Sequence, residues 1–368
     1  MVAPDSTFTT DMHGGPCAII DRSSLRHNLN VVRSTAPNSK VMAVVKANAY
    51  GHGLVPVAQA LLGADAFGVA RLKEAVALRD AGIGQHIVLL EGVFSHDDLD
   101  IAAQLQLDVV VHSFAQLDMV ESWSSRRRVS VWCKIDSGMN RLGFRVEDFA
   151  TAWARLLKCA QIQHLRVMTH LADADSRDHD RTPQQIALFN KSIAGINVER
   201  SIGNSAGLVA WPEARLEWVR PGLMLYGMSP FADSVAADLN LRPAMTLVTP
   251  VIAVREVKAG EEVGYGGTWR AAQTTRVGIA AVGYGDGYPR QARTGTPVYV
   301  DGQIRPIVGR VSMDMIAIDL GFDSRVETGE PVILWGENLP AEHVATFADT
   351  IPYELVCAMS QRVALQYR

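Results

Sequence analysis

Cysteine is scarce in this sequence, and the few cysteines are scattered. The 368 residues include four of them, Cys17, Cys133, Cys159 and Cys357, and no two form a Cys-x-x-Cys pair. This argues against a disulfide framework and a structural zinc site, and it favours a reducing compartment. Long apolar runs are also missing, because no stretch approaches the ~18 uninterrupted apolar residues that a membrane-spanning helix needs.

An excess of positive charge and a secretory leader are missing as well. The formal net charge is −4, which gives no electrostatic reason to expect nucleic acid. The one basic run, 126–128, is best interpreted as a solvated loop. The first residues, MVAPDSTFTTDMHGG, contain acidic side chains but neither a basic region nor an apolar core. We therefore expect a soluble cytoplasmic protein that binds neither nucleic acid nor a membrane.

Short apolar runs alternate with helix-like segments over the first two thirds of the chain. The runs lie at 41–45, 67–70, 87–90, 108–112, 129–135, 165–169, 200–204 and 218–222. Strands that alternate with helices indicate a parallel sheet with both faces covered, and eight strands can close a (β/α)8 barrel. An open doubly wound sheet is the alternative, but no G-x-G-x-x-G follows the first run to favour a dinucleotide fold.

The pattern changes after Asn240. Segments rich in β-branched residues follow, separated by glycine turns such as Asp301-Gly302, and helical periodicity stays weak until 342–350. We therefore predict an α/β protein: a (β/α)8 barrel over residues 1–242, followed by a mainly β domain over residues 243–368.

Polar side chains collect where the predicted barrel strands end. They are Lys46, Lys134, Asp136, His170, Asn204, Ser205 and Arg220. Barrel enzymes place their catalytic groups at the C-terminal ends of the strands, so this grouping indicates an enzyme. Lys46 ends the first run, in VMAVVKANAYGHG (41–53). Burial there would favour the amine and make it a nucleophile or a base, whereas a lysine that extends to solvent is the equal alternative.

Two glycine-containing segments follow the seventh and eighth runs. GNSAG (203–207) and RPGLMLYG (220–227) stand where barrels commonly bind phosphate, although each alone could be a simple tight turn. THLADADSRDHD (169–180) is rich in histidine and aspartate but matches no metal-ligand spacing, so we expect no metal. From the residues alone, His52 has no chemical role.

With these segments assembled, the chain resembles the alanine racemase family over nearly its whole length. The matching segments are AVVKANAYGHG (43–53), DSGMNRLGF (136–144), MTHLADAD (168–175), GNSAG, VRPGLMLYG (219–227), GYGGTW (264–269), GRVSMDM (309–315) and IPYEL (351–355). They occur in the family's order across both predicted domains. Ser312 stands where cysteine is common in the family.

The resemblance implies a homodimer that uses pyridoxal 5'-phosphate and completes each active site with the partner chain. Lys46 would bind the cofactor through a Schiff base and act as one catalytic base, and Tyr265 of the partner subunit would be the other. His170 would orient that tyrosine, and Arg220 would face the pyridine nitrogen. The residues expected to bind the cofactor further are Tyr50, Asn204, Ser205, Gly222, Leu223 and Tyr353.

The resemblance also implies how the substrate is held. Arg141 would assist the substrate carboxylate, Met313 of the partner subunit would lie near the substrate, and Lys134 matches a family lysine that is often carbamylated. The implied reaction interconverts L-alanine and D-alanine, which would supply D-alanine for bacterial peptidoglycan or degrade it. A decarboxylase of similar architecture, a non-catalytic pyridoxal-phosphate carrier and a purely structural barrel are the alternatives. The sequence leaves the breadth of substrates and the firmness of the dimer open.

Overall fold

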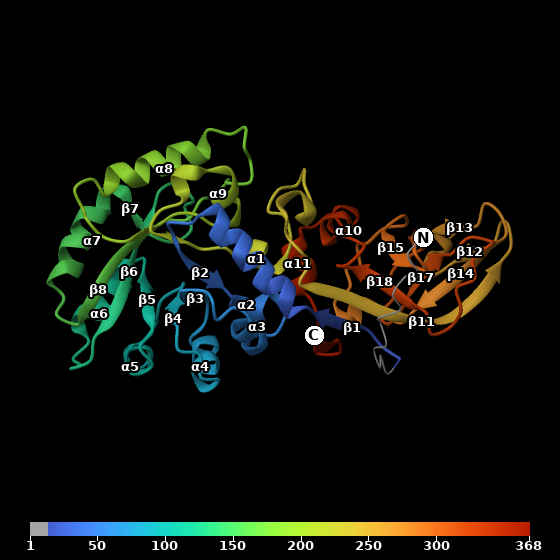
Figure 1. Cartoon of the computed structure of the whole chain (residues 1–368), viewed down its shortest axis with the longest axis horizontal. Coiled ribbons are helices and arrows are strands. Elements are labelled where there is room, and N and C mark those ends of the chain that lie inside the picture. The colour runs from blue at the N-terminus through green and yellow to red at the C-terminus, as the bar shows by residue number, and fades with distance from the viewer. Residues whose placement is uncertain (1–13) are drawn as a thin grey trace. The chain divides into compact units, whose positions relative to one another are not determined.

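The computed structural model describes residues 14–368, which divide into two compact units (Figure 1). The barrel unit comprises Leu25–Leu225 and Ser229–Ser234. The β unit comprises the described residues up to Ser24, together with Tyr226–Met228 and Val235–Arg368. Each unit contains its own large sheet.

Eight parallel strands close into a barrel in the barrel unit. They are β2 (Lys40–Val44), β3 (Ala66–Val69), β4 (His86–Leu89), β5 (Asp108–Val111), β6 (Val129–Asp136), β8 (Ile162–Met168), β9 (Arg200–Ser201) and β10 (Trp218–Val219). Each strand pairs with the next, and β10 pairs with β2, which closes the ring. A short strand, β7 (Phe144–Arg145), extends the end of β6. The predicted barrel is confirmed, and each predicted run overlaps one of its strands.

Helices connect the strands and lie outside them (Figure 1). They are α1 (Arg22–Thr35), α2 (Lys46–Tyr50), α3 (Leu54–Ala60), α4 (Leu72–Asp80), α5 (His96–Gln104), α6 (Phe114–Ser122), α7 (Val146–Lys158), α8 (Arg181–Ser192) and α9 (Ser205–Ala210). In α7, Phe149, Trp153 and Leu156 are buried at helical spacing, so one face packs inward. No helix within residues 14–368 is long and apolar enough to cross a membrane.

The barrel interior is filled by side chains. Met42, Ala66, Val88, Val110, Trp132, Met168 and Trp218 form one buried cluster. The rings of Trp132 and Trp218 meet edge to face with centroids 5.8 Å apart. The barrel is therefore a packed core, and chemistry is confined to its ends.

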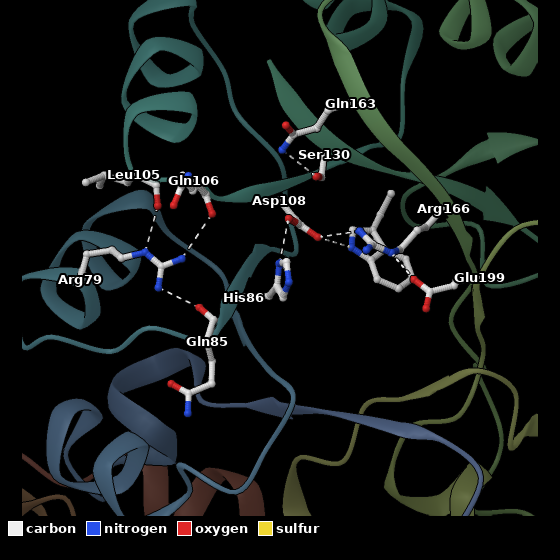
Figure 2. Close-up of polar contacts among 11 residues, drawn as sticks. Arg79, Gln85, His86, Leu105, Gln106, Asp108, Ser130, Gln163, Arg166 and Glu199 are labelled. Carbon is white, nitrogen blue, oxygen red and sulfur yellow. Dashed lines mark hydrogen bonds and ion pairs between the residues drawn. The ribbon is translucent and has the colours of Figure 1, made fainter. Parts of the chain in front are cut away.

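A polar network lies at the end of the barrel where the strands begin (Figure 2). Asp108, buried at the start of β5, accepts hydrogen bonds from Trp132 at 3.2 Å and Arg166 at 3.0 Å. Arg166 also donates to Glu199 at 2.6 Å, and Lys40 donates to the other oxygen of Glu199 at 2.6 Å. Although burial raises it, these hydrogen bonds bring the pKa of Glu199 down to about 2. The network stabilises the end of the barrel opposite the candidate site.

The β unit is built around a ring of six antiparallel strands. They are β11 (Met245–Val257), β14 (Thr275–Ala280), β15 (Pro297–Val300), β16 (Gln303–Val308), β17 (Ile316–Asp319) and β18 (Pro331–Trp335). The long strand β11 pairs with both β14 and β18 and so closes the ring. The mainly β character predicted for this region is confirmed. Two helices follow β18, namely α10 (Ala341–Phe347) and α11 (Pro352–Cys357).

Two further strands extend this sheet beyond β11. They are β1 (Cys17–Ile20), which pairs antiparallel with β11, and β19 (Ala364–Tyr367), which pairs parallel with β1. The expected division at residue 242 places β1 among the barrel residues, whereas its hydrogen bonds join it to the β unit. All four residues of β1 are buried, and a short, wholly apolar strand fits either sheet, so its sequence carries no local signal of which sheet it will join.

Candidate active site

The first barrel strand leads into a turn of unusual handedness. Lys46 follows β2, and Ala47, Asn48, Ala49 and Tyr50 then have φ between 52° and 55°. This left-handed conformation costs roughly 1–2 kcal/mol per non-glycine residue, or roughly 4–8 kcal/mol over the turn. A cost of that size persists only where neighbouring contacts enforce it, and such strain gathers at functional sites.

The turn is held by its own backbone and by side chains. The carbonyl oxygens of Ala47, Asn48 and Ala49 each accept a backbone N–H at 3.0 Å, from Gly51, Gly53 and His52 respectively. Glu74, in the first turn of α4, accepts the N–H of Ala47 at 2.8 Å. The Asn48 side chain accepts the N–H of Leu54 at 2.9 Å, and the His52 ring lies 2.8 Å from the Tyr50 carbonyl. The turn is thus anchored on both sides.

Tyr50, at the far end of the turn, reaches the segments that follow β9 and β10. A Cβ atom on Gly222 would lie 2.4 Å from the Tyr50 hydroxyl, so only glycine fits beneath it. Ser205 Oγ accepts the N–H of Gly222 at 3.0 Å and that of Met224 at 3.3 Å, which leaves the serine hydrogen for donation. The hydroxyls of Tyr50 and Ser205 and the backbone of Gly222 therefore form one small cradle. Its chemistry fits a phosphate group.

The neighbouring residues Asn204 and Leu223 are placed by local structure. The Asn204 side chain caps α9 by accepting the N–H of Gly207 at 2.8 Å. Leu223 is buried and opens the 3-10 turn η2 (Leu223–Tyr226). The structure therefore brings Tyr50, Ser205 and Gly222 together, and Asn204 and Leu223 adjoin them in the chain.

Arg220 is a buried cation with neutral partners. Its side chain donates to Ser201 Oγ and to the Thr169 carbonyl, both at 2.6 Å, and more weakly to the Ile202 carbonyl at 3.3 Å. Burial lowers the pKa of Arg220 to about 10. Within residues 14–368 no carboxylate is among these partners, so the charge is available to act on something bound nearby.

His170 lies beside Arg220 and is held neutral. The Nδ1 atom of His170 is 3.4 Å from a guanidinium nitrogen of Arg220. Burial, followed by the positive charges of Arg220 and Lys134, lowers the pKa of His170 well below 6.5. Because guanidinium only donates, Nδ1 is the acceptor and Nε2 carries the hydrogen, which makes His170 a donor through its outer nitrogen.

Lys134 is a third group with a shifted pKa at the same end of the barrel. Burial is the main cause that lowers its pKa to about 8, and the positive charges of Arg220, Arg141 and Lys46 act in the same direction. Arg141 is exposed on the loop after β6. Asp136 fixes that loop by accepting the N–H groups of residues 138, 139 and 140 at 2.8–3.0 Å. Perturbed groups that influence one another are typical of an active site.

Three of the expected site residues belong to the β unit. Tyr265 lies in the 3-10 turn η4 (Tyr265–Gly267), between the short strands β12 (Glu262–Val263) and β13 (Trp269–Arg270), and is 71% exposed. Met313 is half exposed, and Tyr353 is partly buried in α11. The carbonyl oxygen of Met313 accepts the N–H of Gly285 at 2.9 Å, which docks its loop on a neighbouring turn.

Several residues that shape the site were not predicted from the sequence to belong to it. Thr169 and Ser201 hold Arg220, Glu74 and Asn48 tether the turn after Lys46, and His52 contacts Tyr50. Two features of the sequence could have pointed to these residues. They are hydroxyl residues at the ends of apolar strands and an acidic residue in the first turn of a helix. The segment 169–180, which is rich in histidine and aspartate, is held by its own side chains. The Asp173 carboxylate accepts a hydrogen bond from Ser176 and lies beside Nδ1 of His179, both at 2.8 Å. No three or more metal-ligating side chains cluster within residues 14–368.

A closed barrel with ionisable and small residues gathered at the C-terminal ends of its strands is the architecture of a barrel enzyme. Two family models cover nearly all of the chain. "Alanine racemase, N-terminal domain" matches residues 20–230, and "Alanine racemase, C-terminal domain" matches residues 244–367. The chain belongs to the alanine racemase family, which makes it an isomerase of the amino-acid racemase class.

Individual relatives agree with this assignment. The alanine racemase of Vibrio parahaemolyticus is 52% identical over 351 residues, which is 95% of this chain and 98% of the relative. The crystal structure of biosynthetic alanine racemase from Pseudomonas aeruginosa is 42% identical, with a TM-score of 0.93, and covers 96% of this chain and 99% of its own. The alanine racemase from Acinetobacter baumannii is 40% identical, with a TM-score of 0.91 and the same coverage.

Proposed function

We propose that this protein interconverts L-alanine and D-alanine with pyridoxal 5'-phosphate, using Lys46 and Tyr265 of the partner subunit as the two bases. The observation that carries the proposal is the strained turn, which presents Lys46 at one end and Tyr50, over Gly222 and beside Ser205, at the other. A lysine amine and a phosphate cradle joined by one rigid turn suit a ligand with an aldehyde at one end and a phosphate at the other.

The cofactor would be held by this chain's residues at both ends. Lys46 would bind it covalently, and Tyr50, Ser205, Gly222 and Leu223 would hold its phosphate, with Asn204 beside Ser205 in the chain. Tyr353, the other residue expected to bind the cofactor, belongs to the β unit. When bound, pyridoxal phosphate withdraws electrons from the substrate and so makes its α-proton more acidic. Arg220 would face the pyridine nitrogen, which it can bind only as a donor. The ring nitrogen would then stay unprotonated, and the electron withdrawal would be restrained.

Racemisation requires a base on each side of the α-carbon, because one proton leaves from one face and another is delivered to the opposite face. Lys46 would serve one face. Tyr265, exposed on its glycine-rich turn, suits the other face when supplied by a second copy of the chain. The neutral His170, with Nε2–H free to donate once Nδ1 accepts from Arg220, would orient the phenolic oxygen of that tyrosine. A homodimer with shared active sites follows from this arrangement.

The substrate carboxylate would be bound by Arg141 and by the loop of the partner's Met313. Lys134 would support Arg141. With a pKa of about 8, about a tenth of Lys134 is neutral amine at pH 7, far more than for an ordinary lysine. Such an amine can attack carbon dioxide to form a carbamate with loss of one proton, and the resulting anion would pair with Arg141.

We further propose that the enzyme acts in the cytoplasm and supplies D-alanine for peptidoglycan. The relative from Pseudomonas aeruginosa is described as biosynthetic, which favours this role over degradation. In this proposal, the domain of residues 1–242 binds the cofactor and the domain of residues 243–368 supplies the second base. The strand β1 lies within the first range but pairs with the β unit's sheet.

The test uses the purified full-length protein. We expect a yellow protein whose absorbance band disappears on borohydride reduction and which converts L-alanine to D-alanine. Tyr265→Phe should lower racemisation by about 10²–10⁴-fold while the colour remains, since it removes a general base without touching the cofactor site. A colourless protein would refute the cofactor, and a yellow protein inert towards alanine would favour a carrier. Unchanged racemisation by Tyr265→Phe would refute its role.

A further inference from the structure

His52 adjoins the strained turn but has no part in the chemistry proposed above. Its side chain is fully buried, and its Nδ1 atom lies 2.8 Å from the carbonyl oxygen of Tyr50. Because a carbonyl oxygen can only accept, Nδ1 carries the hydrogen and donates it. Burial lowers the pKa of His52 to about 4, so the ring is neutral at physiological pH and can keep this tautomer.

The hydrogen bond from the His52 ring adds to the backbone hydrogen bonds that hold the turn. The carbonyl oxygens of Ala47, Asn48 and Ala49 accept backbone N–H groups, whereas that of Tyr50 accepts the His52 ring. Tyr50 is itself a non-glycine residue with φ near 52°. Its peptide unit would relax towards a right-handed conformation unless a contact prevented this. The His52 ring makes that contact from a position locked by its own burial.

The conformation of Tyr50 decides where its hydroxyl lies. That hydroxyl sits over Gly222, so close that a Cβ atom there would be 2.4 Å away. Gly222 is tied in turn to Ser205 Oγ through its N–H at 3.0 Å. A change of φ at Tyr50 swings the whole ring about the backbone, and would therefore separate the hydroxyl from Gly222 and Ser205 while Lys46 stays at the end of β2.

We propose that His52 is a positioning residue, whose hydrogen bond to the Tyr50 carbonyl keeps the Tyr50 hydroxyl in the phosphate cradle at a fixed separation from Lys46. The inference rests on the proposed function, since it takes Lys46 and the cradle to bind the two ends of one cofactor. His52 would therefore strengthen the binding of a ligand that carries the phosphate group and not of one that lacks it.

Two variants separate the hydrogen bond from the bulk of the ring. His52→Leu keeps an apolar side chain of moderate size and removes the donor, whereas His52→Asn places an amide N–H near the position of Nδ1. Holoenzyme of each variant is stripped of cofactor, and rebinding of pyridoxal 5'-phosphate and of pyridoxal is titrated by absorbance. We expect His52→Leu to weaken pyridoxal phosphate about 30-fold and pyridoxal less than about threefold, with His52→Asn close to wild type.

A double-variant comparison links the effect to Tyr50. Tyr50→Phe should show the same selective loss, and His52→Leu combined with Tyr50→Phe should be no weaker than Tyr50→Phe alone. Equal losses for both ligands, or additive losses in the double variant, would overturn the inference. If His52→Leu does not fold, His52→Gln replaces it, because its amide extends past the Nδ1 position and should show the same selective loss. Failure of the wild type to bind pyridoxal phosphate would instead refute the proposed function.

Discussion

Arg220 is the single residue that we propose to set the course of the reaction. Arg220 is 5% exposed, and within residues 14–368 its guanidinium bonds neutral groups, among them Ser201 Oγ and the Thr169 carbonyl. An unneutralised cation is stable there because several oxygen atoms surround it. Against a pyridine nitrogen such a donor discourages protonation, whereas an acidic side chain would promote it.

We therefore predict that Arg220→Glu diverts the reaction. The cofactor should convert to its pyridoxamine form during incubation with alanine much faster than in the wild type, and racemisation should fall by about 10²-fold or more. Absorbance spectra recorded during turnover measure the conversion. Arg220→Lys is the matched control, since it keeps a cationic donor and should convert slowly. An unchanged rate of conversion in Arg220→Glu would contradict this role for Arg220.

At the scale of elements, the site depends on how closely the segments after β9 and β10 approach the turn after β2. Gly222 has no side chain to separate them, and the Tyr50 hydroxyl lies 2.4 Å from the point where a Cβ atom of residue 222 would be. The same contact brings the Ser205 hydroxyl and the Gly222 N–H together at 3.0 Å. The proposed affinity for phosphate would thus depend on the segments after three barrel strands and not on any one loop.

Gly222→Ala should weaken the binding of pyridoxal 5'-phosphate by at least about tenfold, because the added methyl group must displace the Tyr50 ring. Gly84→Ala is the matched control, since a Cβ atom there meets nothing within 4 Å. Titration of the cofactor-stripped proteins, with thermal unfolding to confirm that both variants fold, measures the effect. Equal affinity in the two variants would show that the cradle does not hold the phosphate.

Some elements of the barrel could be predicted from the sequence and others could not. The eight barrel strands were predictable because strands buried on both faces are continuous apolar runs. The left-handed turn was not, since Ala-Asn-Ala-Tyr contains helix-favouring alanines and no glycine until Gly51. The partners Thr169 and Ser201 could not be predicted, because a hydroxyl residue inside an apolar run is also typical of ordinary packing. Such contacts form between segments far apart in the chain.

At the scale of the whole molecule, the buried histidines connect the site to stability. The pKa of His52 is about 4 in the folded state against 6.5 ordinarily, and that of His170 is also well below 6.5. The unfolded chain therefore binds more protons between these pH values, and the free energy of unfolding must fall as the pH falls from 6.5 towards 4. At about 1.4 kcal/mol per pH unit, His52 alone accounts for about 3 kcal/mol.

We predict that denaturant unfolding of the wild type loses stability steeply over this pH range and that His52→Asn loses less, because its side chain does not titrate. The same slope in the wild type and in His52→Asn would show that His52 is not held neutral by burial.

The central claim for the whole molecule is that each active site combines Lys46 of one subunit with Tyr265 of the other. Lys46→Ala and Tyr265→Phe should each be inactive as homodimers. Co-expression of the two variants tests the claim most directly, because a mixed dimer contains one site with both natural residues. Racemisation should return to about a quarter of the wild-type rate per subunit if subunits assemble at random. A mixture as inactive as its components would contradict the claim.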